Sequence, residues 1–282
     1  MRHVFQFDPC VIAVVTFLLL GRCISLVAQE PDYVKAVEEG AQTIEVTLDG
    51  QTPLKRIVAY KWANAATPQQ VGQLHLFVGD DQRPLASAKI GPTVAQSRER
   101  PDPLDPRILR IDHVIVTMTE QPLECRFGER TVWTSPKSQL LFSPLPRAPD
   151  PRASAAGRLT EAKMLARRFT AQVDQITAIH ASSNREQRLL PTPIYRYGSQ
   201  DYSKDGTVDG VLFVFTVEGG NPTTFLHLEV NRQKESIAWQ YAISRRGVSG
   251  LEVTYDGVKV WEVPHIGSSS PQEILYRIGD PR

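Results

Sequence analysis

The segment 201–210, D-Y-S-K-D-G-T-V-D-G, has the residue types of a calcium-binding loop. Such a loop needs hard oxygen donors at spaced positions and a glycine at the sixth. Leu212 occupies the twelfth position, where a bidentate glutamate belongs, and the flanking sequence is typical of strands. An acidic hairpin loop, with Asp and Gly serving turn geometry, is therefore the favoured interpretation, and Ca²⁺ is a weaker alternative. The residues that would bind the ion are Asp201, Ser203, Asp205 and Asp209.

Aromatic side chains on the predicted strands are the second group able to bind a ligand. Tyr195, Arg196 and Tyr197 form a short run in which two rings flank a cation, and such a surface stacks on a sugar or grips a peptide. Aromatic residues also favour strands for packing reasons, so core and sheet packing is the more general interpretation. These three residues are the candidate ligand-binding residues of the chain.

No other pattern assigns a reaction. The histidines after residue 28 do not pair as H-x-x-x-H, and none lies at metal-ligand spacing from a cysteine, so no zinc site is expected. The chain has no G-x-S-x-G motif, phosphate loop or dinucleotide fingerprint. We assign no catalytic residue from the sequence.

Charge and composition exclude further classes of protein. The 282 residues contain 32 Lys+Arg and 31 Asp+Glu, for a net charge of +1, so no basic field points to a nucleic-acid partner. At 41% hydrophobic and 22% charged, the chain has the composition of a globular protein that buries a core.

The first 28 residues are typical of a secretory signal peptide. The run V-I-A-V-V-T-F-L-L-L (11–20) ends before Arg22, which makes it about half the length of a membrane-spanning helix. Small residues at Ser25 and Ala28 suit a cleavage site. Export to the periplasm or the extracellular space is expected, with no membrane span after cleavage; an uncleaved anchor is the alternative. Cys125 then remains without a second cysteine, and its alternating surroundings predict a buried strand residue.

The two halves of the chain match each other in one order. The segment 123–136 matches 251–264 at a constant separation of 128 residues, with Leu, Glu, Val, Trp and Pro identical. Further back, Gly72 and Leu74 match Gly210 and Leu212 at a separation of 138. The pair Tyr60 and Trp62 matches Tyr195 and Tyr197 at 135. These matches predict a duplicated unit.

Each unit reads as one helix followed by strands. Thr160 is the expected cap of a helix over 159–169, and a shorter helix is expected to follow Asp32. Asp256-Gly257, between two alternating runs, predicts a two-residue hairpin. The fold class is therefore α+β and strand-rich, with two duplicated antiparallel-sheet units that each carry one helix. The expected divisions are a signal peptide (1–28), a first unit (29–142), a Pro/Ala-rich linker (143–158), a second unit (159–266) and a loosely ordered tail (267–282).

Several runs of residues carry a resemblance to a known family. In the second unit they are L-L-P-T-P-I-Y-R-Y (189–197), D-G-V-L-F-V-F (209–215), W-Q-Y-A-I-S-R (239–245) and V-K-V-W-E-V-P (258–264). In the first unit they are K-W-A-N (61–64) and R-P-L-A-S (83–87). These runs resemble a family of uncharacterised exported proteins of planctomycete bacteria. The resemblance implies a shared fold and the same duplication, and it brings no reaction, substrate or catalytic residue.

Taken together, the sequence predicts an exported, non-enzymatic binding or structural module of the cell envelope. Its partner would be a protein or a carbohydrate ligand. The alternative is a hydrolase acting on a polymer, with a site between the two units. An acid-lined or histidine-lined cleft between the units would favour the hydrolase, and a flat aromatic face would favour the binding module.

Overall fold

The computed structural model describes residues 32–63, 71–94, 109–135, 140–177, 180–198, 206–217, 220–233, 236–266 and 275–279. The predicted signal peptide lies outside the described residues. From Tyr33 onward the chain forms one compact unit. We call 33–135 the first half and 143–266 the second half. None of the helices in the described ranges is long and apolar enough to span a membrane.

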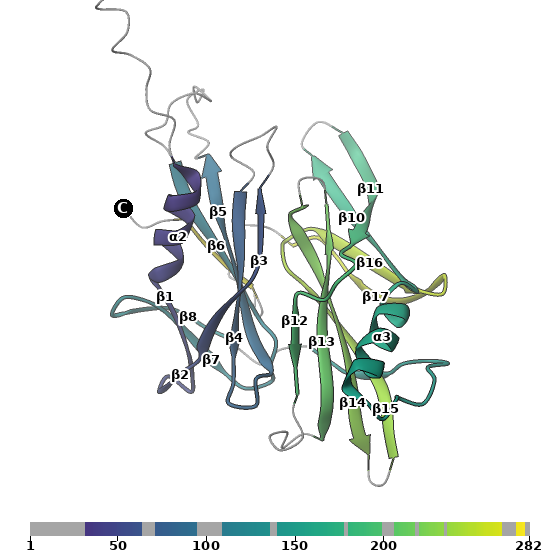
Figure 1. The fold of residues 1–282 in the computed structure, drawn as a ribbon. Helices are drawn as coiled ribbons and strands as arrows, with labels where there is room; N and C mark the ends of the chain where they lie inside the picture. The colour runs from purple at the N-terminus through teal and green to yellow at the C-terminus, as the bar shows by residue number, and fades with distance from the viewer. Residues whose placement is uncertain are drawn as a thin grey trace, which may run out of the picture. The chain divides into compact units, whose positions relative to one another are not determined.

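The first half consists of a helix and two antiparallel sheets (Figure 1). One sheet has the order β2-β1-β7-β8, and the other has the order β18-β6-β5-β4-β3. The elements are α2 (Tyr33–Gln42), β1 (Ile44–Leu48), β2 (Thr52–Pro53), β3 (Lys55–Ala63), β4 (Val71–Val78), β5 (Pro84–Val94), β6 (Leu109–Thr117), β7 (Leu123–Phe127), β8 (Arg130–Thr134) and, from the end of the chain, β18 (Leu275–Gly279).

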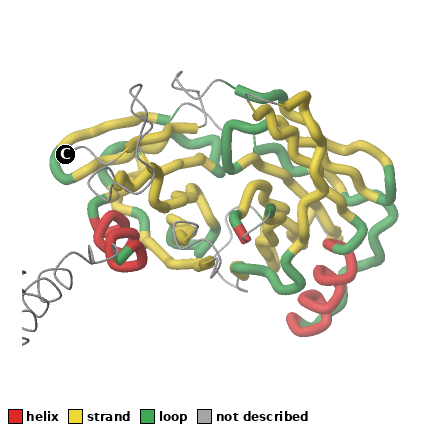
Figure 2. Tube along the Cα trace, turned by 90° about the horizontal axis from the view of Figure 1, so that it is seen from above, coloured by secondary structure: helices red, strands yellow, loops and turns green. Residues whose placement is uncertain are grey.

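The second half consists of a helix and a single nine-stranded antiparallel sheet. Its order is β17-β16-β10-β11-β13-β14-β15-β9, and β12 pairs with β13 beside this path. The elements are β9 (Ser143–Pro144), α3 (Ala155–Ala166), β10 (Phe169–Thr177), β11 (His180–Leu189), β12 (Tyr195–Tyr197), β13 (Thr207–Thr216), β14 (Pro222–Gln233), β15 (Ser236–Arg245), β16 (Gly250–Tyr255) and β17 (Val258–Val263). Figure 2 shows how much of the described chain is strand.

The strands of the two halves pair in the same order. In each half the last two strands and the first strand after the helix are neighbours: β8-β7-β1 in one and β17-β16-β10 in the other. The three strands that precede the last two form the meanders β6-β5-β4 and β15-β14-β13. All of these pairs are antiparallel. The predicted strand-rich α+β class is therefore confirmed.

A large ring covers a glycine at the same place in each half. Trp62 on β3 pairs with Gly72 on β4, and Tyr197 on β12 pairs with Gly210 on β13. A Cβ atom on either glycine would overlap the ring of its partner. Each ring also stacks on a tyrosine two residues before it. The stacked pairs are Tyr60–Trp62, with centroids 6.0 Å apart, and Tyr195–Tyr197, with centroids 6.1 Å apart.

Three apolar clusters form the core. The first lies in the first half and includes Val37, Phe77 and Ile115; the second lies in the second half and includes Leu165, Phe213 and Leu226. The third draws on both halves, because successive residues of β4 and β13 point to opposite faces and both faces are buried. Its buried members are Trp62, Leu74, Leu76, Val78, Met118, Leu212, Val214 and Phe225.

Several local predictions can be compared with the structure. The hairpin at Asp256-Gly257 is confirmed, with φ of 48° and 77° at the two turn residues, as a tight turn of this kind requires. Cys125 is fully buried on β7, as predicted, and burial raises the pKa of its thiol to about 12. Trp133 is buried in the first core, whereas its counterpart Trp261 is only half-buried against the second.

The helix of the second half begins earlier than the sequence indicated. Ser154, not Thr160, is the N-cap, and its hydroxyl accepts a hydrogen bond from the Gly157 amide at 3.1 Å. The hydroxyl of Thr160 instead donates to the carbonyl of Ala156 within the helix. The segment 143–158, predicted as a linker, thus contains β9 and the first turn of α3. Loose order was the wrong expectation for 275–279, which form β18 against β6.

The close approach of Trp62 to Gly72 generates a stability prediction. Gly72→Ala should lower the free energy of unfolding by about 1–3 kcal/mol, because the new Cβ would overlap the ring and lie 2.7 Å from the carbonyl oxygen of Ile90. Urea unfolding measures this change. Gly247→Ala is the matched control, because a Cβ there meets no atom within 4 Å. Equal effects of the two substitutions would contradict the prediction.

Candidate functional site

The three candidate ligand-binding residues do not share a face. On β12, Tyr195 and Tyr197 point to one side, and Arg196 points to the other by alternation. The hydroxyl of Tyr195 donates to the carbonyl of Gln82 in the first half at 3.1 Å, and Tyr197 is 3% exposed. Tyr197 and Arg196 thus belong to two different polar clusters, and Tyr195 belongs to neither. That it binds a ligand stays a prediction.

The first cluster surrounds Glu229, a fully buried carboxylate on β14. The hydroxyl of Tyr197 donates to its Oε1 at 2.7 Å, and the amide of Gln240 donates to its Oε2 at 2.9 Å. Arg83, from the first half, lies 3.1 Å from Oε1 and donates to Oε2 at 3.2 Å. A carboxylate without water needs such partners, and here they come from both halves.

Burial dominates the electrostatics of this cluster. It raises the pKa of Glu229, while Arg83 and the hydrogen bonds from Tyr197 and Gln240 act in the opposite direction. Desolvation also raises the pKa of Tyr197 well above its usual value. His227, two residues before Glu229 on the same face, is 2% exposed, and burial followed by the charge of Arg83 lowers its pKa to about 3. The imidazole is therefore neutral at pH 7.

The cluster combines groups that can transfer protons with a cation that can stabilise negative charge. Glu229, Tyr197 and neutral His227 are the proton-carrying groups, and Arg83 is the cation, positioned 4.8 Å over the ring of Phe142. The Nε2 atom of His227 is buried without a hydrogen-bond partner. The side chains of Glu229, Tyr197, Gln240 and Arg83 bond one another, so their immediate role is to join the two halves.

Sequence reasoning missed Glu229 as a site residue. Its signal was a single carboxylate within F-L-H-L-E-V (225–230), an apolar run that reads as a buried strand. Its cationic partner lies 146 residues earlier in the chain, so no local pattern joins the two.

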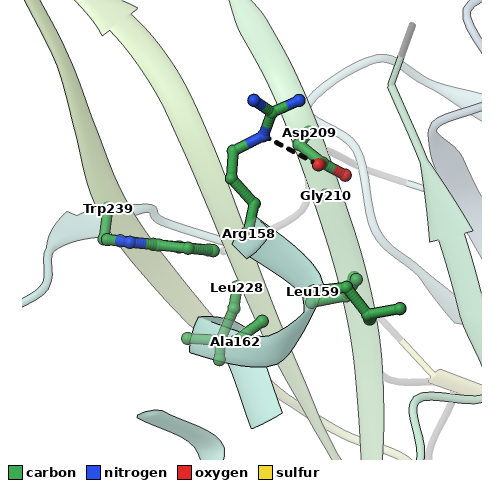
Figure 3. A pocket seen from close by; sticks show the side chains of 8 residues that line it. Arg158, Leu159, Ala162, Asp209, Gly210, Leu228 and Trp239 are labelled. Atoms are coloured by element: carbon green, nitrogen blue, oxygen red, sulfur yellow. Dashed lines mark hydrogen bonds and ion pairs between the residues drawn. The ribbon is translucent and has the colours of Figure 1, made fainter. Parts of the chain in front are cut away.

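The second cluster surrounds Asp209, which lies on β13 beside the beginning of α3. Arg158, on the helix, donates from Nε to Asp209 at 2.9 Å (Figure 3). Arg196 binds the same carboxylate from Nε at 3.0 Å and from Nη2 at 2.7 Å, and this hydrogen bonding raises the pKa of Arg196. Arg158 also donates to the carbonyls of Arg152 and Ala153. The cluster thereby fastens the beginning of the helix to β12 and β13.

A shallow recess, with no enclosed space large enough for a water molecule, adjoins this ion pair. Its walls are largely apolar, with Trp239 on one side and Leu159 and Ala162 of the helix on another (Figure 3). Two guanidinium groups bind the single carboxylate of Asp209, so its oxygens are already occupied, and the three side chains together carry one net positive charge.

The proposed calcium ligands divide between described and undescribed parts of the chain. Asp201, Ser203 and Asp205 lie outside the described residues. Asp209 is described, and its carboxylate is occupied by two guanidinium groups. Within the described ranges, no group of three or more His, Cys, Asp or Glu side chains is placed to hold a metal ion. Calcium binding stays a prediction.

A further polar group lies between α2 and the sheet of the first half. His75 is 2% exposed, and its Nε2 lies 3.0 Å from Oε1 of Gln73. Burial, followed by the charges of Arg56 and Lys61, lowers the pKa of this imidazole to about 4. His75 is therefore a second neutral histidine enclosed by the fold.

Comparison with known proteins does not add a family: no family model, curated protein or solved structure matches the chain.

The buried histidines predict a loss of stability in acid. The folded-state pKa values of His227 and His75, about 3 and about 4, lie below the ordinary 6.5. Below pH 6.5 the unfolded chain therefore binds protons at these imidazoles, whereas the folded chain does not until the pH approaches its own lower pKa values. Stability should fall as the pH drops below about 6.5. His227→Gln should reduce the loss between pH 6.5 and 4.5 by about 2–3 kcal/mol, measured by urea unfolding across that range. His265→Gln, at an exposed position, is the control; equal acid sensitivity in both variants would refute the assignment.

The Glu229 cluster predicts unequal effects of removing two tyrosine hydroxyls. Tyr197→Phe should destabilise the protein by about 1–2 kcal/mol, because a buried carboxylate loses a donor. Tyr195→Phe is the matched control, since its half-buried hydroxyl meets a carbonyl and its loss should cost less than about 1 kcal/mol. Thermal or urea unfolding measures both. A larger effect at Tyr195 would contradict the prediction.

Proposed function

We propose that this protein is an exported, non-enzymatic binding or structural module of the cell envelope. The observation that carries the proposal is the Glu229 cluster, in which Arg83 from one half completes the bonding of a buried carboxylate in the other. Glu229, Tyr197 and Arg83, which an enzyme would direct at a substrate, are here bonded to one another. A cluster that is bonded internally and joins the two halves supports the role of a rigid scaffold, which would present a fixed surface to its partner.

We further propose that the two halves derive from one duplicated unit. The same strand order, the matched sequence positions and the ring-over-glycine contact in each half support this origin. An experimentally determined structure tests it: 44–134 should superpose on 169–263 with β1 on β10 and β4 on β13. A different equivalence of strands would contradict a common origin.

The partner class follows from the exported location. A protein or a carbohydrate of the envelope is the ligand that this proposal names. Cell fractionation and N-terminal sequencing of the full chain test export, with cleavage expected near residues 25–28. Full-length protein retained in the cytoplasm would overturn this part of the proposal.

The binding role is tested on insoluble envelope polymers. Purified protein is mixed with peptidoglycan sacculi or with envelope polysaccharide, and both co-sedimentation and release of soluble fragments are measured. We expect co-sedimentation without fragments. Protein that neither sediments with any polymer nor binds an envelope protein in a crosslinking experiment would leave only the structural role.

A hydrolase acting on a polymer is the second candidate. The grouping of Glu229, His227 and Tyr197 with Arg83 from the other half favours it, because these groups are able to perform acid–base catalysis when a substrate reaches them. Release of fragments that Glu229→Gln abolishes would establish this alternative. Glu252→Gln, at a partly exposed glutamate on β16, is the matched control and should not change the outcome.

A further inference from the structure

Arg246, directly after β15, is a buried cation for which the described part of the chain provides no counter-ion. Its side chain is 4% exposed, and its Nε donates to the carbonyl of Pro222 at 2.7 Å. Its Nη1 is buried and has no hydrogen-bond partner. Burial alone lowers the pKa of Arg246 to about 9, and no carboxylate contributes to that shift. A guanidinium that keeps a buried N–H group unpaired and has no carboxylate partner is only partly compensated for its lost hydration.

A second buried donor without an acceptor lies at the same segment. Gln187, on β11, is 4% exposed, and its Oε1 accepts hydrogen bonds from the hydroxyls of Thr223 and Thr224. Its Nε2 is buried and unpartnered. Arg246 and Gln187 therefore both contact 222–224, and each keeps an N–H group that lacks an acceptor.

In the first half, the residue that matches Arg246 is the uncharged Met118. The backbone N–H of Arg246 donates to the carbonyl of Thr223 at 2.9 Å; at the matching place, the N–H of Met118 donates to the carbonyl of Leu85 at 2.7 Å. Met118 is buried in the third apolar cluster. The same backbone hydrogen bond therefore forms where the side chain is apolar, so this bond does not depend on the guanidinium of Arg246.

We propose that Arg246 and Gln187 form a binding site for an oxyanion group of the ligand. A carboxylate or a phosphate supplies the acceptor oxygens that a guanidinium and a carboxamide lack, and charge-assisted hydrogen bonds of this kind are the strong ones. This inference rests on the proposed binding function for the identity of the molecule that carries the anion. Its test uses small anions and purified protein, so the two proposals can fail separately.

The experiment measures thermal unfolding of the full chain in a buffer without oxyanions, titrated with inorganic phosphate, sodium sulfate or sodium acetate. Sodium chloride at matched ionic strength corrects for screening. The melting temperature of the wild type should rise by about 3 °C when an anion is at roughly ten times its Kd. Preference for acetate would indicate a carboxylate ligand, and preference for phosphate or sulfate would indicate a tetrahedral one.

Three variants locate the effect. Arg246→Met copies the first half, so it should fold and lose the response to anions. Gln187→Glu keeps acceptors for the two threonines and adds an internal carboxylate, so it too should lose the response. Arg232→Met is the control, because it removes one positive charge from an exposed position on β14 and should respond like the wild type.

Two results would overturn the proposal. One is a wild type whose melting temperature does not change with any of the three anions beyond the effect of chloride. The other is an Arg246→Met or Gln187→Glu variant that folds and keeps the wild-type response, since the anions would then bind elsewhere.

Discussion

The burial of β4 and β13 on both faces is the constraint on which the rest of the described fold depends. Each strand has a helix-side core on one face and the third apolar cluster on the other. Such strands have no polar face to present to water, so each half needs the other to complete its burial. Joining the halves is consequently a condition for folding, and the polar groups between them must bond internally or lose hydration without compensation.

That condition explains why the candidate residues occur where they do. Glu229 lies on the strand next to β13, on the face that meets the first half, and Arg83 reaches it from the turn before β5. Asp209 lies on the opposite face, where the beginning of α3 brings Arg158. Arg246 differs from both, because no acidic side chain approaches it within the described chain. The proposed ligand supplies the acceptor that the unpaired N–H group of Arg246 lacks.

The sequence predicted what depends on local pattern and could not predict what depends on distant contacts. The Asp256-Gly257 hairpin, the buried Cys125 and the strand-rich class follow from spacing and residue type over a few positions. The start of α3 was missed because R-A-S-A-A-G (152–157) resembles a flexible linker, although Ser154 caps two alanines that favour helix. Glu229 and Arg246 were missed because burial, and not residue type, makes them unusual.

The pairing of β18 with β6 has a consequence for the order of events during synthesis. The strand that borders β6 is drawn from 275–279, whereas β6 itself spans 109–117, so the whole of the second half is synthesised between the two strands. One edge of the sheet in the first half therefore stays open until both halves have left the ribosome. The sheet that begins first can be completed only after the strands of the second half are available.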